Sequence, residues 1–146
     1  MKDPALRVLE RDWVQVFVRM RAETWKCPTC GEVYFADPVT PNPCPSCNKP
    51  HAFPFYIKTS SGYNVPAHQR TVLYQCHTST DADKDFDVKT GEMMVKGDEI
   101  GLKNVSTERW SRIKDGVQAP VEPGRAARLE KGVKLDFGRG ASTEII

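Results

Sequence analysis

The sequence predicts a mainly β protein built from three successive parts. Three observations lead to this prediction: one helical pattern near the N-terminus, a proline- and cysteine-rich segment after it, and short apolar runs separated by turn residues over the remainder. We place the three parts at residues 1–21, 22–54 and 55–146. A chain of 146 residues is long enough to bury one ordinary hydrophobic core or two small ones.

The first part, residues 1–21, is expected to contain an N-terminal helix over residues 4–21. Pro4 suits the first turn of a helix. Apolar side chains then recur at spacings of three and four residues, which places them on one helix face. These side chains are Leu6, Leu9, Trp13, Phe17 and Met20. A lone helix cannot bury so large a stripe, so we expect it to pack on the rest of this chain or on a neighbour.

The second part, residues 22–54, contains two C-P-x-C turns among most of the prolines of the chain. Cys27 and Cys30 flank the first turn, and Cys44 and Cys47 flank the second. Two residues between paired cysteines allow both sulfurs to meet one ion. Four cysteines form a closed set, whereas catalytic zinc keeps one position open for water. We therefore predict a zinc ribbon with one structural Zn²⁺, whose binding supplies folding energy that this segment otherwise lacks.

Other uses of the cysteines fit the sequence less well. Disulfides disagree with a reducing compartment, and a redox C-x-x-C motif needs only one pair of cysteines. His51 follows the second turn and is able to replace a thiolate as a ligand, although nothing in the spacing requires it. The fifth cysteine, Cys76, lies in the apolar run VLYQCH and is expected to be a strand or core residue.

Charge and hydropathy argue against nucleic acid and membranes as partners. The 21 basic and 19 acidic residues give a net charge of +2, which provides no general attraction to either. Residues 22–54 carry two lysines and three acidic residues, and Zn²⁺ with four thiolates adds −2, so this part sums to −3. No apolar run approaches the roughly 20 residues of a membrane-spanning helix. The N-terminus also lacks a secretory signal pattern, and we expect a cytoplasmic protein.

The third part, residues 55–146, is expected to be an antiparallel β-sandwich. Short apolar runs alternate with turn residues along its length. Asp115 and Gly116 between WSRIK and VQA predict a two-residue hairpin turn, because both residues can take positive φ angles. Apolar and polar residues alternate from Val133 to Phe137, which is the period of a half-buried strand.

Two motifs in this part resemble functional loops without meeting their requirements. Residues 136–138 spell Asp-Phe-Gly, the magnesium-binding triplet of protein kinases, but no Gly-rich loop, strand lysine or H-R-D loop precedes it. The alternation predicts Asp136 to be an outward-facing strand residue. The acidic run 81–92 has the spacing of a calcium loop, but Phe86 stands where such a loop needs glycine. No nucleophile with a paired base can be assembled from the spacing, so the sequence predicts no enzyme.

The segments EIGLKNVSTERW, VQAPVEPGRAARLEKGVKLDFG and STEII resemble the second half of a forkhead-associated (FHA) β-sandwich. With the helix and the C-P-x-C-G ribbon, nearly the whole chain resembles the non-catalytic C-terminal region of bacterial serine/threonine kinases from the tellurium-resistance-associated stress cluster. Those kinases are encoded beside a von Willebrand A protein and a metal-dependent phosphatase. The resemblance implies a degenerate FHA-like sandwich in an interaction or regulatory module. The partners it implies are a kinase domain, or the phosphatase and von Willebrand A proteins of the cluster.

The sequence departs from phosphothreonine-binding FHA domains where those domains hold the phosphate. It has no G-R pair before its central strands, no S-x-x-H segment and no N-G-[TS] turn. Asn104, Ser106, Thr107 and Arg109 remain candidates for the apical partner surface, although local turn hydrogen bonds account better for Asn104 and Ser106. We favour a non-catalytic, zinc-binding interaction module. An FHA-type phosphopeptide reader stays open, as does a zinc-ribbon nucleic-acid adaptor, which the basic excess of residues 107–140 supports weakly.

Overall fold

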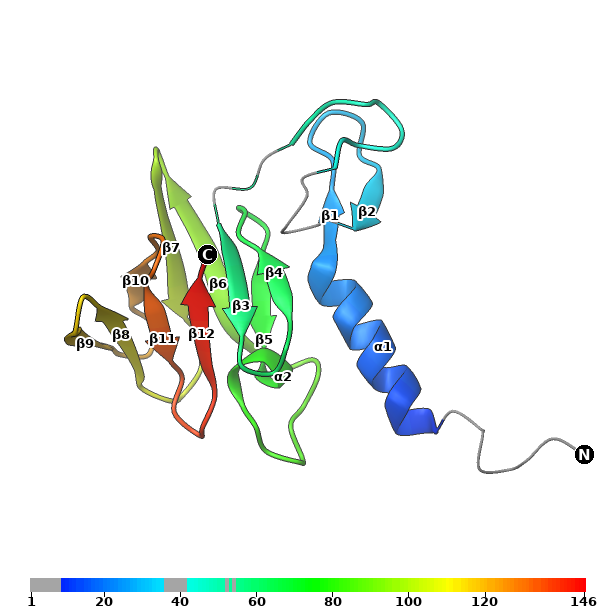
Figure 1. The fold of residues 1–146 in the computed structure, drawn as a ribbon. Helices are drawn as coiled ribbons and strands as arrows, with labels where there is room; N and C mark the ends of the chain where they lie inside the picture. Colours follow the sequence, from blue (N-terminus) through cyan, green and yellow to red (C-terminus); the bar gives the residue numbers. More distant parts are fainter. Residues whose placement is uncertain (1–8, 36–41, 52, 54) are drawn as a thin grey trace, which may run out of the picture.

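The computed structural model describes residues 9–35, 42–51, 53 and 55–146. It confirms a mainly β protein with an N-terminal helix, three antiparallel sheets and a cluster of four cysteines. Figure 1 shows the helix and the small two-stranded sheet on one side of the molecule, with the two larger sheets facing each other beside them.

Helix α1 (Glu10–Glu23) lies along the side of the sandwich next to strand β4 (Figure 1). Val18 and Ala22, one turn apart, enter the core, and Val14 packs beside them. Residues 4–8 of the predicted helix lie outside the described residues, and the helix ends two residues later than predicted, at Glu23. Within the part of the chain that the structure describes, no helix has the length and apolar character needed to cross a membrane.

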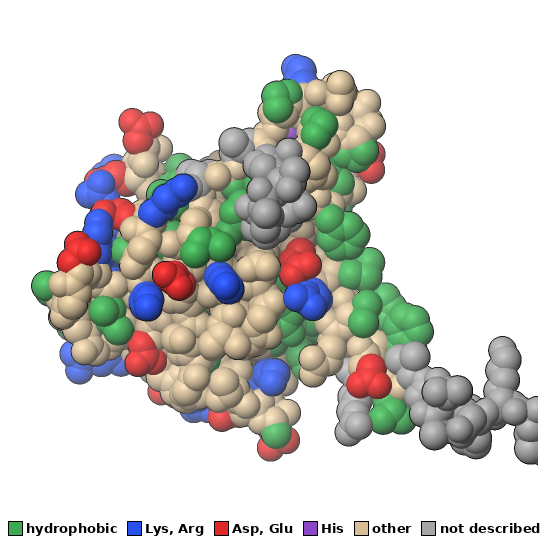
Figure 2. Space-filling model, in the orientation of Figure 1, with side chains coloured by type: hydrophobic (Ala, Val, Ile, Leu, Met, Phe, Trp, Pro, Cys, Tyr) green, Lys and Arg blue, Asp and Glu red, His purple; other side chains and the backbone are tan. Residues whose placement is uncertain are grey.

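The apolar stripe predicted on this helix lies on its exposed face. Trp13 and Phe17 are 51% and 59% exposed, and their rings stack on each other at 5.9 Å. The exposed set comprises Leu9, Trp13, Val16, Phe17 and Met20. Leu6 lies outside the described residues. Figure 2 shows hydrophobic side chains gathered along this side of the molecule. The helix turns its smaller valine and alanine side chains inward, because they permit a close approach to β4, so the described chain does not cover the stripe.

Strands β1 (Thr24–Lys26) and β2 (Val33–Phe35) form the two-stranded sheet of the ribbon. Strand β1 follows α1 directly, so the ribbon continues from the helix without a spacer. The first cysteine turn connects the two strands, and the second lies among residues 42–51. Tyr34 on β2 is buried between the cysteines, whereas Phe35 is 50% exposed. Neighbouring strand residues point to opposite faces, so the burial of Tyr34 leaves Phe35 on the outer face of β2.

The rest of the chain forms two antiparallel sheets that pack face to face. The six-stranded sheet has the order β4-β3-β12-β11-β8-β9, and the four-stranded sheet has the order β10-β7-β6-β5. The first sheet consists of β3 (Tyr56–Thr59), β4 (Asn64–Pro66), β8 (Trp110–Lys114), β9 (Val117–Val121), β11 (Lys134–Asp136) and β12 (Ser142–Ile145). The second consists of β5 (Val72–Tyr74), β6 (Lys89–Lys96), β7 (Glu99–Asn104) and β10 (Ala126–Arg128).

One hydrophobic cluster fills the space between these sheets. Trp110 and Phe137 are its largest fully buried side chains, and their rings meet edge to face at 4.8 Å. Gly91 on β6 makes room for this pair: a Cβ atom there would lie 3.2 Å from the Trp110 ring and 3.2 Å from Leu102. Close packing around Trp110 thus explains a glycine in the middle of a long strand.

Two turn predictions are confirmed. Asp115 and Gly116 have φ angles of 51° and 78° and connect β8 to β9 as a two-residue hairpin. Asp136 is an exposed residue at the end of β11, and its carboxylate accepts the Gly138 N–H at 2.8 Å. Phe137 enters the core next to it. The Asp-Phe-Gly triplet therefore forms the end of a strand and the turn after it.

Candidate metal centre and neighbouring surfaces

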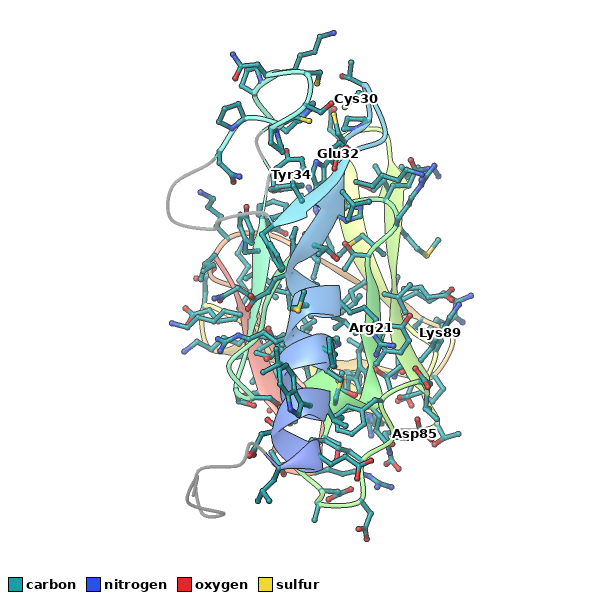
Figure 3. All side chains as sticks on the ribbon, turned by 90° about the vertical axis from the view of Figure 1, so that its right-hand side faces the viewer. Arg21, Cys30, Glu32, Tyr34, Asp85 and Lys89 are labelled. Carbon is teal, nitrogen blue, oxygen red and sulfur yellow. The ribbon has the colours of Figure 1, made fainter. Side chains whose placement is uncertain are left out.

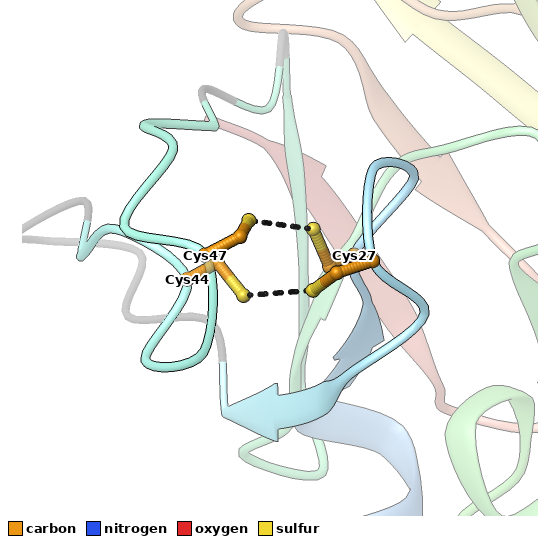
Figure 4. Close-up of side chains that lie close together, drawn as sticks. Cys27, Cys44 and Cys47 are labelled. Atoms are coloured by element: carbon orange, nitrogen blue, oxygen red, sulfur yellow. Dashed lines mark hydrogen bonds between the residues drawn. The ribbon is translucent and has the colours of Figure 1, made fainter.

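The four predicted metal ligands come together where the two cysteine turns meet. The sulfurs of Cys27, Cys30, Cys44 and Cys47 all lie within 4.8 Å of one another. Two sulfur pairs span the turns, Cys27 with Cys47 at 3.7 Å and Cys30 with Cys44 at 3.5 Å. The dashed lines in Figure 4 join sulfurs of one turn to sulfurs of the other. A tetrahedron of ~2.3 Å zinc–sulfur bonds has edges of about 3.8 Å. The cluster therefore fits one tetrahedral ion, and its cysteines are free of disulfides.

The two cysteine turns share one backbone geometry. The Gly31 N–H donates to the Cys27 carbonyl at 3.0 Å, and the Asn48 N–H donates to the Cys44 carbonyl at 2.8 Å. Both donors have positive φ angles, 80° for Gly31 and 56° for Asn48. Glycine and asparagine tolerate this conformation better than most residues, which accounts for both residue types at these equivalent positions. A glycine or asparagine directly after each cysteine pair is the sequence signal that predicts this turn geometry.

Hydrogen bonds prepare Cys27 to act as a thiolate. Burial alone raises the pKa of its thiol, but donation from the Cys30 and Thr29 backbone N–H groups and contact with His51 lower it to about 5. Burial, followed by the charges of the nearby thiolates, raises the pKa of Tyr34, whose ring packs against Cys27 and Cys44. A cation at the cluster would offset the mutual repulsion of the thiolates.

His51 lies beside the cluster. Its Nε2 atom is 3.2 Å from the Cys27 sulfur, a distance that suits a hydrogen bond to the thiolate. The sequence left open whether His51 replaces a cysteine ligand. Because the four sulfurs already form a complete tetrahedral set, the geometry favours a supporting hydrogen bond.

Aromatic side chains connect the ribbon to the sandwich. The Trp25 ring meets the rings of Phe53 and His68 edge to face, each at 4.4 Å. Phe53 in turn meets Tyr56, which is buried at the start of β3. The chain of contacts runs from β1 of the ribbon into the six-stranded sheet.

The four candidate residues of the apical surface divide into two kinds. Asn104 is fully buried, and its side-chain amide donates to the carbonyls of Glu108 and Val121. Its Oδ1 atom accepts hydrogen bonds from the N–H and hydroxyl of Ser106. These two residues hold the loop together from within. Thr107 and Arg109 are exposed, and Arg109 forms an ion pair with Glu122 at 3.0 Å.

Next to this loop lies a cavity of about 180 Å³, which we call the apical cleft. Ser106 and Thr107 line it together with residues of α2 and β6. Its cationic lining consists of Lys89 and Arg139. Lys89 pairs with Glu92, while Arg139 pairs with Asp81 and Glu108 at 2.9 and 2.7 Å. The described carboxylates therefore neutralise both cations of this cleft.

The run VLYQCH is not a continuous strand. Strand β5 ends at Tyr74, and a one-turn helix α2 (Gln75–Thr78) follows. Cys76 is fully buried, and burial raises the pKa of its thiol. His77 is 1% exposed, and its Nδ1 atom accepts the Tyr74 N–H. No hydrogen bond joins the Cys76 sulfur to the His77 ring among the described residues, which agrees with a core role for the cysteine.

Comparison with known proteins gives no family for this chain. No protein-family model, curated protein or solved structure matches it. The resemblance to FHA sandwiches and to kinase-associated ribbons stays a prediction, and function has to be argued from the site itself.

Proposed function

We propose that this chain is a non-catalytic, zinc-stabilised protein-interaction or regulatory module, the C-terminal part of a bacterial signalling serine/threonine kinase. The observation that carries the proposal is the four-cysteine cluster with its tetrahedral spacing. The FHA-like character of the sandwich and the link to the tellurium-resistance-associated cluster rest on the sequence resemblance. In this role the protein provides a surface to which its partners bind.

The donor set supports zinc as the metal. Four thiolates in a tetrahedral arrangement suit Zn²⁺, whereas Mg²⁺ and Ca²⁺ prefer oxygen ligands. Cys27, Cys30, Cys44 and Cys47 would hold the ion, and the ion would supply folding energy to the ribbon. With all four positions taken by protein ligands, no position is left for water or substrate. This favours a structural role over a catalytic one.

The exposed stripe on α1 supports a protein partner. Five large apolar side chains on one helix face form a patch of the kind that marks a contact with another protein surface. The resemblance places a kinase domain before this helix in the natural protein, which would bring that domain close to the stripe. A kinase domain is therefore the first partner to test, followed by the phosphatase and von Willebrand A proteins.

Metal content tests the first half of this proposal. We expect one zinc per chain by elemental analysis of the purified protein, and loss of that zinc in Cys44→Ser. Cys76→Ser is the matched control, because Cys76 is buried in the sandwich core and should leave the metal in place. A folded protein without zinc, or full retention in Cys44→Ser, contradicts the proposal.

Binding tests the second half. The protein is titrated with the serine/threonine kinase domain that the full open reading frame is proposed to encode, expressed separately, and complex formation is followed by calorimetry. We expect Phe17→Asp to abolish binding, while Val117→Asp, at an equally exposed site on β9, should not. If Phe17→Asp binds as tightly as the original protein, the stripe is not part of the interface. If no complex forms at all, the kinase domain is not the partner.

The alternative function is a phosphopeptide reader. The apical cleft lies beside Ser106 and Thr107, the residues that the FHA resemblance points to. Both of its cations are already paired with carboxylates, which weakens this site for phosphate. The third reading, a nucleic-acid adaptor, has the acidic charge of the ribbon against it.

A further inference from the structure

A second hollow lies between the ribbon and the sandwich, which we call the junction cleft. It consists of two adjoining cavities of about 250 and 370 Å³. Both cavities are lined by Trp25 and Lys26 on β1 and by His68 and Arg70 between β4 and β5. Tyr74 adds a second aromatic wall to the first cavity.

The lining of the junction cleft carries positive charge and no negative charge. Arg21, Lys26 and Arg70 line it, and no aspartate or glutamate among the described residues does. Arg21 lies over the Tyr74 ring at 4.0 Å and is paired with Asp87. Figure 3 shows Arg21 on α1, on the side of the molecule below the ribbon. Lys26 and Arg70 form no ion pair with any described residue, so their charges are available to a ligand.

His77, one of the residues that line the first cavity, carries a buried hydrogen-bond donor without a partner. His77 Nδ1 accepts the Tyr74 N–H at 3.0 Å, so the proton of the neutral ring lies on Nε2. Burial lowers the pKa of His77 to about 4, which keeps the ring neutral near pH 7. Its Nε2 atom is buried and has no hydrogen-bond partner in the described structure. Buried donors are nearly always satisfied in folded proteins, so this one points to an acceptor supplied by a ligand or by water.

The two clefts differ in the property that matters for phosphate. In the apical cleft Lys89 and Arg139 are both paired with carboxylates. In the junction cleft Lys26 and Arg70 form no ion pair with a described residue, and His77 in the lining has a buried donor without a partner. A phosphate group carries a charge of about −1.5 to −2 and three acceptor oxygens, which two free cations and further donors can satisfy.

We propose that the junction cleft binds a phosphorylated side chain of a protein partner. Lys26 and Arg70 contact the phosphate, and the Trp25 and Tyr74 rings cover the apolar part of the neighbouring segment. This inference rests on the proposed function as an interaction module, and it moves phosphate recognition from the apical loop to the seam between ribbon and sandwich. Because Lys26 directly precedes the ligand Cys27, the site exists only while the ribbon is folded.

The test is a titration of the zinc-loaded, ¹⁵N-labelled protein, followed by amide chemical shifts. The probes are an alanine-flanked phosphoserine pentapeptide, its unphosphorylated form and inorganic phosphate. We expect the phosphopeptide to shift the amides of residues 24–26 and 68–71, and the unphosphorylated peptide to leave them unchanged. Lys26→Gln/Arg70→Gln should weaken binding by about tenfold or more, since each substitution removes a charge-assisted hydrogen bond.

Lys89→Gln/Lys131→Gln is the matched control, because it removes two positive charges elsewhere, one of them at the apical cleft, and should change the affinity less than about twofold. Shifts centred on residues 106–108, equal affinity in the first double variant, or no binding at millimolar peptide would each overturn the proposal. Inorganic phosphate binding as tightly as the peptide would overturn the assignment to a protein partner. Zinc is measured in the same sample, so a loaded protein that fails to bind counts against the cleft and not against the zinc module.

Discussion

The ribbon and the sandwich are stabilised by different means. In the ribbon the buried side chains are Cys27, Tyr34 and Cys44, with Trp25 and Cys47 packed against them. In the sandwich one hydrophobic cluster runs through both sheets around Trp110 and Phe137. Each large apolar side chain that is fully buried contributes about 1.5 to 3 kcal/mol. The sandwich therefore has a core of its own, whereas most of what the ribbon buries are metal ligands.

Metal removal should produce the largest effect and should separate the two regions. Structural zinc contributes about 10 to 16 kcal/mol in small zinc-binding peptides, so chelation should unfold the described ribbon, residues 24–35 and 42–51. Because Trp25 contacts Phe53 and His68, we expect amide resonances in residues 55–75 to shift as well. Resonances of β8 and β9, at the far edge of the six-stranded sheet, should stay in place.

This experiment also shows whether the ribbon is an independent unit. If chelation leaves the spectrum of residues 55–75 unchanged, the aromatic contacts at the junction do not couple the two regions. Cys76→Ser provides the comparison, since its zinc-loaded spectrum should change around the core and not in the ribbon.

Truncation of a side chain in the sandwich core should destabilise the sandwich and leave the metal site of the ribbon intact. Trp110→Ala removes the largest fully buried side chain and leaves a cavity against Phe137, so the free energy of unfolding should fall by about 3 to 5 kcal/mol. Urea denaturation measures the loss, and zinc content should remain at one per chain. Val117→Ala, at a site that is 69% exposed, should change the free energy by less than about 0.5 kcal/mol. Zinc loss in the folded tryptophan variant would mean that the two regions depend on one core.

A smaller effect is expected at Asn104, where a structural role competes with a binding role. Asn104→Ala removes the amide that donates to the carbonyls of Glu108 and Val121. Leaving buried acceptors unsatisfied costs about 1 to 3 kcal/mol, which urea denaturation resolves. Thr107→Ala in the same loop is exposed and should be neutral. If Asn104→Ala is as stable as the original protein, Asn104 has no structural role and a binding role becomes the better explanation.

Local chemistry explains what could be predicted from the sequence. The cysteine cluster and the Asp115-Gly116 hairpin each depend on residue types a few positions apart, and both are confirmed in the structure. The orientation of α1 could not be predicted, because the helix has two apolar faces. In the structure the face with Val18 and Ala22 packs against the sandwich. The spacing of apolar residues alone does not show whether this face or the face with Trp13 and Phe17 is buried.

The junction cleft was beyond sequence reasoning for another reason. Lys26 and Arg70 are separated by most of the ribbon and the first two strands of the sandwich. They line the same cavities because α1, which leads directly into β1, packs against β4. Tertiary packing also decides where the strand in the run VLYQCH ends, and Cys76 takes the core role of the two that were expected. Val72, Leu73 and Tyr74 form the strand, but the chain then turns into α2, where tertiary burial of Cys76 and His77 overrides the strand pattern.

The smallest effect is expected at Asp136. The result is informative because a strand-end residue and a magnesium ligand would respond very differently to substitution. Asp136 is exposed, and one carboxylate oxygen accepts the Gly138 N–H. Asparagine keeps that acceptor, so Asp136→Asn should leave the free energy of unfolding within about 0.5 kcal/mol of the original, while Asp136→Ala should lose up to about 1 kcal/mol. A magnesium ligand behaves differently, because the loss of its charge would abolish any phosphate transfer. We therefore expect the background ATP hydrolysis of the purified protein to be the same in both variants. A selective loss in Asp136→Asn would show that the carboxylate takes part in catalysis and that the triplet is more than the end of a strand.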